Sequence, residues 1–350
     1  MQFFKKYTGF IVLAAIGCVL FFLGKSRLFT DNLSGTASFK SKISACIPAD
    51  RNNFSFEKVV LDLNAVFDPA FDKGWTVAQI DSLAAGVKKS INNSAEPEEI
   101  MKRFNDYFFV NGGYVFDAKA NALIYEGAGD TGVTAEDFLN YQSIERVIKR
   151  RQGICLSLSM LYLIVAGRLN IPIYGVIVPG HIFVRYQDSR HSGINSETTF
   201  GGYEYYGYKG SSGAEFLDKT IYNKCLDNFT VIAAFLNNFS HLYYVEKQYS
   251  KALFLARKST EMAPDYPESR NNLGIMYAQD GKLEDAGREL EESLRLFPDS
   301  TATQLNLGLV YLDEKRYIMA EDHLNRALND KKTVIQAKDA IARLIRRRGY

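Results

Sequence analysis

The sequence predicts a single membrane-spanning helix near the N-terminus, then an α+β domain, and then an all-α stack of repeated helix pairs. Three observations predict this order. An uncharged apolar segment lies near the N-terminus, at residues 7–24. A segment at 155–169 that is apolar on nearly every side predicts a buried helix, and short strand-like segments follow it. The last third of the chain repeats itself with a period of 34 residues.

The N-terminal segment has the length and composition of a membrane anchor. Residues 7–24 comprise 18 residues without a charge, with two lysines before them and a lysine and an arginine soon after. At about 1.5 Å per residue, such a helix just crosses a hydrocarbon core of about 30 Å. The small-residue site of a cleaved signal peptide does not follow it. We therefore expect an uncleaved single-pass anchor, an unstructured polar linker at 25–54, and a periplasmic or otherwise extracytoplasmic body.

Residues 55–225 are predicted to form the α+β domain. Thr76 suits the N-cap of one early helix, and Pro97 suits the first turn of another. The helix at 155–169 is expected to end before Pro172, because proline disfavours a helical residue before it. Short strands are expected next, at 174–178, 181–186 and 194–199.

Residues 230–350 show the helical repeat. Small and aromatic residues recur 34 positions apart, as in Ala252, Ala286 and Ala320, or Tyr243, Tyr277 and Tyr311. The spacing resembles the tetratricopeptide repeat, a pair of helices about 34 residues long. Three units over 230–330 are near the minimum for a stable stack, and a helix at 334–347 would cap it. Stacks of this kind present concave surfaces, so the resemblance implies a protein partner.

Composition excludes several function classes. The formal charge is +2 and the charged residues are well mixed, so we expect no nucleic-acid partner. The one basic run, at 343–348, is expected to be a solvated end. The four cysteines form no CxxC pair, and no calcium-loop motif occurs. We therefore expect neither a metal site nor a cofactor.

Cys155 and His181 are the candidate nucleophile and base. Cys155 follows Gly153 at the predicted start of the buried helix, where unsatisfied N–H groups and a partial positive charge favour a thiolate. His181 opens a strand 26 residues later and can take the thiol proton. A buried cysteine is usually a small hydrophobic residue, and a strand histidine is usually a hydrogen-bonded structural one. Their combination points to an activated thiol.

The third group of such a site orients the imidazole through its second nitrogen. Asn195 and Glu197 lie two apart on the expected return strand, so both face the same side as each other. Either side chain could reach His181. Glu197 is expected first, because a carboxylate stabilises an imidazolium better than an amide does, and Asn195 is the alternative.

A longer pattern resembles the transglutaminase-like superfamily, and most closely a bacterial branch with tetratricopeptide repeats after the core. It comprises Arg151-Gln152-Gly153-Ile154-Cys155, Ile171-Pro172 and Pro179-Gly180-His181. The resemblance implies a papain-like fold in which a central helix carries the cysteine and a sheet holds the histidine and an acid. The family acid is usually aspartate in an Asp-Pro-Thr or Asp-Pro-Phe run, whereas Glu197-Thr198-Thr199 stands here.

By this resemblance, the protein would be a membrane-anchored cysteine hydrolase or acyltransferase that acts on amide bonds of a protein or peptide. The repeats would recruit a protein partner. Many relatives in this branch lack the cysteine. The alternative is therefore a catalytically inactive scaffold that mediates protein–protein interaction at the membrane.

Overall fold

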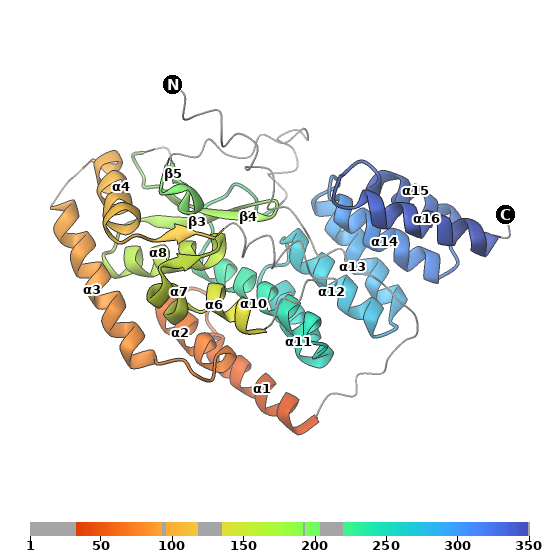
Figure 1. Ribbon diagram of the computed structural model, residues 1–350, viewed down its shortest axis with the longest axis horizontal. Coiled ribbons are helices and arrows are strands. Elements are labelled where there is room, and N and C mark those ends of the chain that lie inside the picture. The colour runs from red at the N-terminus through yellow and green to blue at the C-terminus, as the bar shows by residue number, and fades with distance from the viewer. Residues whose placement is uncertain (1–32, 93–95, 118–134, 192, 204–219, 349–350) are drawn as a thin grey trace.

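The computed structural model describes residues 33–92, 96–117, 135–191, 193–203 and 220–348 (Figure 1). The predicted membrane anchor at 7–24 lies outside these residues. Within the part of the chain that is described, no helix is both long and apolar enough to cross a membrane. The anchor therefore stays a prediction.

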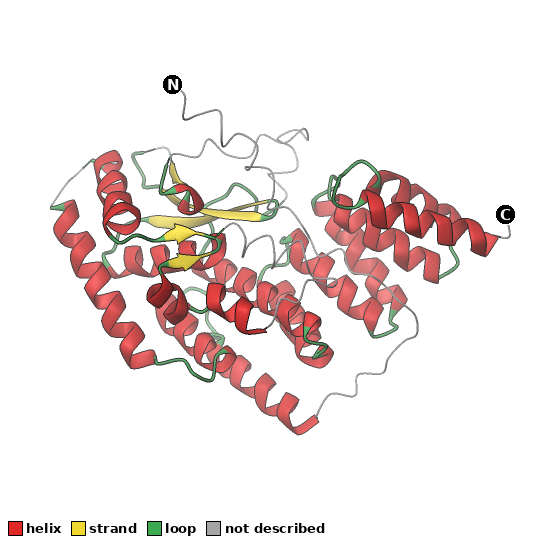
Figure 2. Ribbon diagram, in the orientation of Figure 1, coloured by secondary structure: helices red, strands yellow, loops and turns green. Residues whose placement is uncertain are grey.

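The first part of the chain packs helices around a small sheet (Figure 2). Its elements in chain order are α1 (Leu33–Cys46), α2 (Phe56–Phe67), α3 (Lys73–Ile91), α4 (Pro97–Asn105), the π-helical turn η1 (Asp106–Asn111), β1 (Val115–Phe116), α6 (Ala135–Gln142), α7 (Ile144–Arg150), β2 (Gln152–Gly153), α8 (Cys155–Arg168), β3 (Ile173–Val178), β4 (His181–Tyr186), β5 (Ile194–Ser196) and the 3₁₀ helix η2 (Thr198–Phe200). This mixture agrees with the predicted α+β class.

The main sheet is antiparallel, in the order β3-β4-β5. Val178 pairs with His181 across the first hairpin, and Val184 pairs with Ser196 across the second. Tyr222 forms an isolated bridge to Ile177 on the outer side of β3. Helix α8 packs against β3 and β4. This contact brings the first turn of the helix to the sheet.

Helix α8 confirms the predicted buried helix. Every residue from Cys155 to Ala166 is buried. The helix ends at Arg168, and Asn170 follows in the left-handed conformation with φ 54°. Arg168 bonds Glu57 of α2 at 2.7 Å, which ties the end of the central helix to the first helices of the core.

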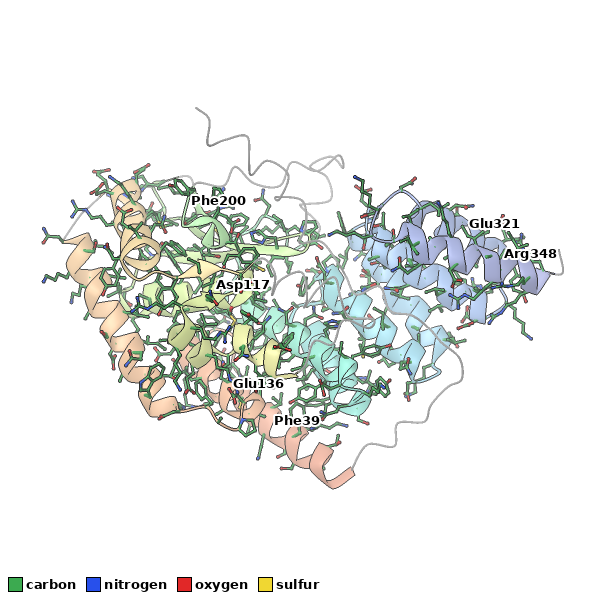
Figure 3. The ribbon with its side chains drawn as sticks, viewed as in Figure 1. Phe39, Asp117, Glu136, Phe200, Glu321 and Arg348 are labelled. Carbon is green, nitrogen blue, oxygen red and sulfur yellow. The ribbon has the colours of Figure 1, made fainter. Side chains whose placement is uncertain are left out.

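Helix α1 corrects the prediction of an unstructured linker at 25–54. Thr36, Phe39 and Ile43 are buried at helical spacing, and the Phe39 ring lies 5.1 Å from that of Tyr243 (Figure 3). Ser38, Ser41 and Lys42 between them are exposed. A narrow stripe of buried residues is therefore enough for α1 to pack against the core. The mostly polar composition of the segment gave no indication of this helix.

Two predicted boundaries are also wrong. Helix α3 begins at Lys73, before Thr76, because Asp72 caps it by accepting from the Trp75 N–H at 2.9 Å. The strand expected at 194–199 ends at Ser196. After that residue the chain turns into η2, which begins with a side-chain cap.

The second part of the chain is all-helical, as the 34-residue period predicts. Its helices are α10 (Asn228–Val245), α11 (Tyr249–Met262), α12 (Pro267–Gln279), α13 (Leu283–Leu296), α14 (Thr301–Asp313), α15 (Tyr317–Ala327) and α16 (Val334–Arg348). A Cβ on Gly274 would lie 2.6 Å from Leu290 Cγ, and a Cβ on Gly308 would lie 2.8 Å from Leu324 Cγ. The recurring glycine therefore lets the two helices of a pair approach closely.

The two parts share a hydrophobic core. Phe239 of α10 stacks on Phe67 of α2 with ring centroids 3.8 Å apart, and Phe235 meets the same ring edge-on at 5.8 Å. The first repeat helix is thus also a wall of the α+β domain, and Figure 1 shows α10 between the sheet and the remaining repeats. The predicted division at 225–230 marks a change of architecture within one continuous core.

The C-terminal basic run makes ion pairs on the repeat stack. Arg347 pairs with Asp313 at 3.0 Å, and Arg348 pairs with Glu321 at 2.8 Å (Figure 3). The expected solvated end is therefore helical and partly neutralised, because acidic side chains of α14 and α15 face it.

Candidate functional site

Cys155 is the first residue of α8, and hydrogen bonds fix the turn before it. The Ile154 N–H donates to Ser157 Oγ at 3.1 Å, and the same hydroxyl donates to the Tyr141 carbonyl oxygen at 2.5 Å. A Cβ on Gly153 would lie 2.8 Å from that hydroxyl oxygen, so the turn requires glycine. The thiol therefore lies at the positive end of the helix dipole, beside amides that have no acceptor within the helix.

A two-residue turn presents His181 at the start of β4. Because Val178 pairs with His181, only Pro179 and Gly180 connect the two strands. Gly180 has φ 68°, a conformation that glycine adopts without steric cost. His181 and Phe183 lie on the same face of the sheet, since alternate strand residues share a face.

The Glu197 carboxylate lies between His181 and Thr199. Its Oε2 is 2.6 Å from His181 Nε2. Its Oε1 accepts from the Thr199 N–H at 2.9 Å and from the Thr199 hydroxyl at 2.7 Å. The same carboxylate thus caps η2 and holds the imidazole. The two hydrogen bonds from Thr199 hold the Glu197 side chain in place whether or not the His181 ring is protonated.

The Cys155 thiol interacts electrostatically with the His181 ring, and this interaction is one of the causes that raise the pKa of the ring. Burial lowers the pKa of His181, but attraction to the Glu197 carboxylate, the hydrogen bond with it and the interaction with Cys155 outweigh it and raise this pKa from 6.5 to about 10. The ring is therefore an imidazolium at neutral pH.

Glu197 complements that charge. Burial raises the pKa of the Glu197 carboxyl, but the charge of His181 and the hydrogen bonds from His181 and Thr199 outweigh it, so the pKa lies below its usual value. The structure thus brings the Glu197 carboxylate within hydrogen-bonding distance of the His181 ring, and the Cys155 thiol is close enough to that ring to affect its charge. A cysteine, a histidine and a carboxylate in this order are typical of an activated sulfur nucleophile.

Asn195, the alternative third residue, has a different partner. Its Oδ1 accepts from Arg185 Nε at 2.6 Å, and Arg185 also bonds the Asn223 carbonyl oxygen at 2.9 Å. Asn195 lies directly opposite Arg185 in the β4–β5 register. Glu197 lies just beyond the end of β5, where it caps η2. Glu197 is the one that bonds the His181 ring.

The supporting residues could not be found by sequence reasoning. Ser159 of α8 bonds Thr198 through their hydroxyls at 2.9 Å, which ties the cysteine helix to η2. Asn105 accepts from Ser196 Oγ at 3.0 Å and donates to the Gly202 carbonyl at 2.8 Å. These bonds brace both ends of the Glu197 segment. The one available signal was the pair of threonines after Glu197, which is typical of a capped turn.

No metal site is visible in the part of the chain that the structure covers. Within those residues, no group of three or more His, Cys, Asp or Glu side chains could hold a metal ion. The three cysteines described there, Cys46, Cys155 and Cys225, are free thiols. The absence of a metal or cofactor from the reaction stays an expectation.

Two family models match parts of this chain. Residues 75–199 match the model of the transglutaminase-like superfamily, and residues 265–333 match that of the tetratricopeptide repeat. UPF0162 proteins from two strains of Xylella fastidiosa are 26% identical over 211 residues, which cover 57% of this chain and 74% of theirs.

Solved repeat domains are more distant. The Sgt2 repeat domain of Aspergillus fumigatus is 20% identical, with a TM-score of 0.31 over 33% of this chain and 78% of that one. The yeast Sti1 TPR2AB domain, solved with pHSP90, is 12% identical with a TM-score of 0.31, over 89% of this chain and 98% of that one.

The fold and the matched family models define a mixed helix–sheet domain of the transglutaminase-like kind with an all-helical stack after it. The chain contains a transglutaminase-like superfamily domain followed by tetratricopeptide repeats.

Proposed function

We propose that this protein is a cysteine hydrolase or acyltransferase of the transglutaminase-like kind, which acts on amide bonds of a protein or peptide. The observation that carries this proposal is the His181 ring, whose Nε2 lies 2.6 Å from Glu197 Oε2 and which interacts electrostatically with the Cys155 thiol at the start of α8. A histidine that only supported the fold would not need two ionisable partners beside a helix N-terminus.

In the first step, Cys155 Sγ attacks the carbonyl carbon of the amide, and the oxygen takes the negative charge. The Cys155 N–H lies at the helix start and is the expected donor to that oxygen. The C–N bond then breaks, and the His181 imidazolium gives its proton to the leaving amine. A thioester remains on Cys155. Glu197 holds the ring in place throughout.

In the second step, the neutral imidazole takes a proton from the attacking water or amine. Attack by water on the thioester carbon breaks the C–S bond and releases an acid, whereas attack by an amine releases a new amide. In both cases the sulfur leaves as thiolate and His181 is again an imidazolium. The residues present support both outcomes.

The repeats and the N-terminal segment complete the proposed function. The stack of α10–α16 would bind a protein partner and bring it to Cys155, since repeat stacks present extended binding surfaces. Residues 7–24 would anchor the protein in a membrane with the body on the extracytoplasmic side. Washing isolated membranes with carbonate should leave the full chain attached, and a chain that lacks residues 7–24 should be released.

Competitive alkylation tests the activated thiol. Cys46 and Cys225 are matched controls within the same chain, because both are half-buried and burial is the main cause that raises the pKa of each thiol. At pH 6, iodoacetamide should modify Cys155 at least about tenfold faster than either, because an ordinary thiol is almost fully protonated there. The His181→Ala variant should lose this difference. Equal rates in the native chain would indicate the non-catalytic scaffold instead.

A further inference from the structure

The hairpin that presents His181 is in contact with the repeat stack. Pro179 and Gly180 at its turn, together with Tyr222 beside β3, line a cavity of about 190 Å³ whose other walls come from the repeats. Phe297, which follows α13, meets the Tyr222 ring edge-on at 5.5 Å. The Pro179–Gly180 turn before His181 therefore packs beside the repeats.

Glu268 makes the polar contact across this boundary. It is the second residue of α12, after Pro267, and its Oε1 accepts a hydrogen bond from the Gly180 N–H at 3.2 Å. The two residues are 88 positions apart in sequence. Burial raises the pKa of Glu268 despite the hydrogen bond from the Gly180 N–H. The side chain is thus held inside the structure at the back of the hairpin.

We propose that Glu268 is a positioning residue of the active site, supplied by the repeats, which fixes the Pro179–Gly180 turn and through it the imidazole of His181. This inference rests on the proposed function. Gly180 immediately precedes His181 and is in the left-handed conformation, so its N–H direction and the start of β4 are set together. A two-residue turn has no slack in which to absorb a displacement.

The consequence is that the repeats are part of the catalytic unit. They do not act only by recruiting a partner. A carboxylate from α12 and a carboxylate from η2 act on His181 from different directions: Glu268 through the backbone and Glu197 through the ring. A partner that entered the cavity beside Glu268 would meet the side chain that holds the turn.

Three substitutions separate this role from a general loss of stability. Glu268→Asp keeps the charge at the start of α12 but withdraws the acceptor by about 1.5 Å, one carbon–carbon bond. Glu268→Gln keeps an oxygen acceptor at full length without the charge. Glu284→Ala removes a highly exposed carboxylate elsewhere in the repeats and serves as the control.

The readout is the rate of Cys155 alkylation by iodoacetate between pH 5 and pH 11, together with thermal unfolding of each variant. Glu268→Asp should lower the rate at least about fivefold, in line with the loss of one buried hydrogen bond. The rate should fall at high pH, where His181 loses the proton whose charge attracts the anionic reagent. In Glu268→Asp this fall should begin at a lower pH than in the native chain. Glu268→Gln should retain both the rate and the profile, and Glu284→Ala should match the native chain.

Native rates and profiles in Glu268→Asp would overturn the proposal, and so would an equal loss in Glu268→Gln and Glu268→Asp. If Glu268→Asp unfolds early, Glu268→Leu, which has no acceptor, replaces it and is measured below its unfolding temperature; a native rate in that variant would also overturn the proposal. The proposed function has a separate test in the native chain. If Cys155 there reacts no faster than Cys46 or Cys225, the function fails before Glu268 is considered.

Discussion

Replacing Glu197 by glutamine should change the charge state of His181 with little change of shape. The amide can still accept a hydrogen bond from the ring, but it carries no charge. The rise of the His181 pKa from 6.5 to about 10 corresponds to about 5 kcal/mol of preference for the imidazolium. Attraction to the Glu197 carboxylate is the largest cause that raises this pKa. The variant should therefore lose much of that preference.

Iodoacetate reports this charge directly, because the imidazolium attracts the anionic reagent to the adjacent sulfur. The native rate at Cys155 should decline only as pH rises through about 10, the pKa of His181. In Glu197→Gln the decline should begin at least about two pH units lower, equivalent to losing about 3 kcal/mol of the preference. The rates come from peptide-resolved mass spectrometry of chains quenched at timed intervals.

The control for this experiment is Glu284→Gln, which neutralises an exposed carboxylate on the repeats. It should leave the profile unchanged. An alkaline decline at the same pH in Glu197→Gln and in the native chain would refute the reasoning, because the carboxylate would then have no effect on the ring. The same pH profile measured with uncharged iodoacetamide distinguishes loss of the His181 charge from loss of the Cys155 thiolate.

Three further outcomes follow from the same geometry. The raised pKa of His181 contributes stability that is fully present below about pH 6.5 and is lost as pH rises through about 10, so urea unfolding should show the native chain losing its advantage over Glu197→Gln across that window. Gly153→Ala should lower the free energy of unfolding by about 1–3 kcal/mol, because its Cβ meets the Ser157 hydroxyl. Gly167→Ala in α8 has open space around its Cβ and should be neutral or stabilising. Gly274→Ala should likewise destabilise the repeats while Gly287→Ala does not; equal effects within either pair would contradict the close approach at these glycines.

Local patterns were enough to predict the central elements. The apolar run from Cys155 predicted a buried helix because it had no polar face, and the structure shows one. The 34-residue period predicted the helix pairs, because small residues must recur where two helices approach. Strand alternation applies only to Asn195, which pairs with Arg185, because β5 ends at Ser196 and Glu197 lies beyond it.

The remaining features depend on contacts that are distant in sequence. Nothing around Glu268 indicates that it reaches Gly180, since the two meet only after the repeats fold against the hairpin. The burial of Phe39 could not be predicted from its mostly polar segment, because the ring packs against Tyr243 of the first repeat. Asn195 bonds Arg185 whereas Glu197 bonds the His181 ring, and neither contact can be read from the sequence. Sequence spacing does not reveal such partners.

The protonation state of the His181 ring gives the most direct test of an ionised sulfur–imidazole pair. Nitrogen-15 spectra of histidine-labelled protein would be recorded from pH 5 to pH 11, with the His181 signals assigned by their loss in His181→Ala. We predict that both ring nitrogens stay protonated until the pH approaches 10. A ring that loses its proton near pH 6.5, like a free histidine, would contradict the pair and with it the activated thiol.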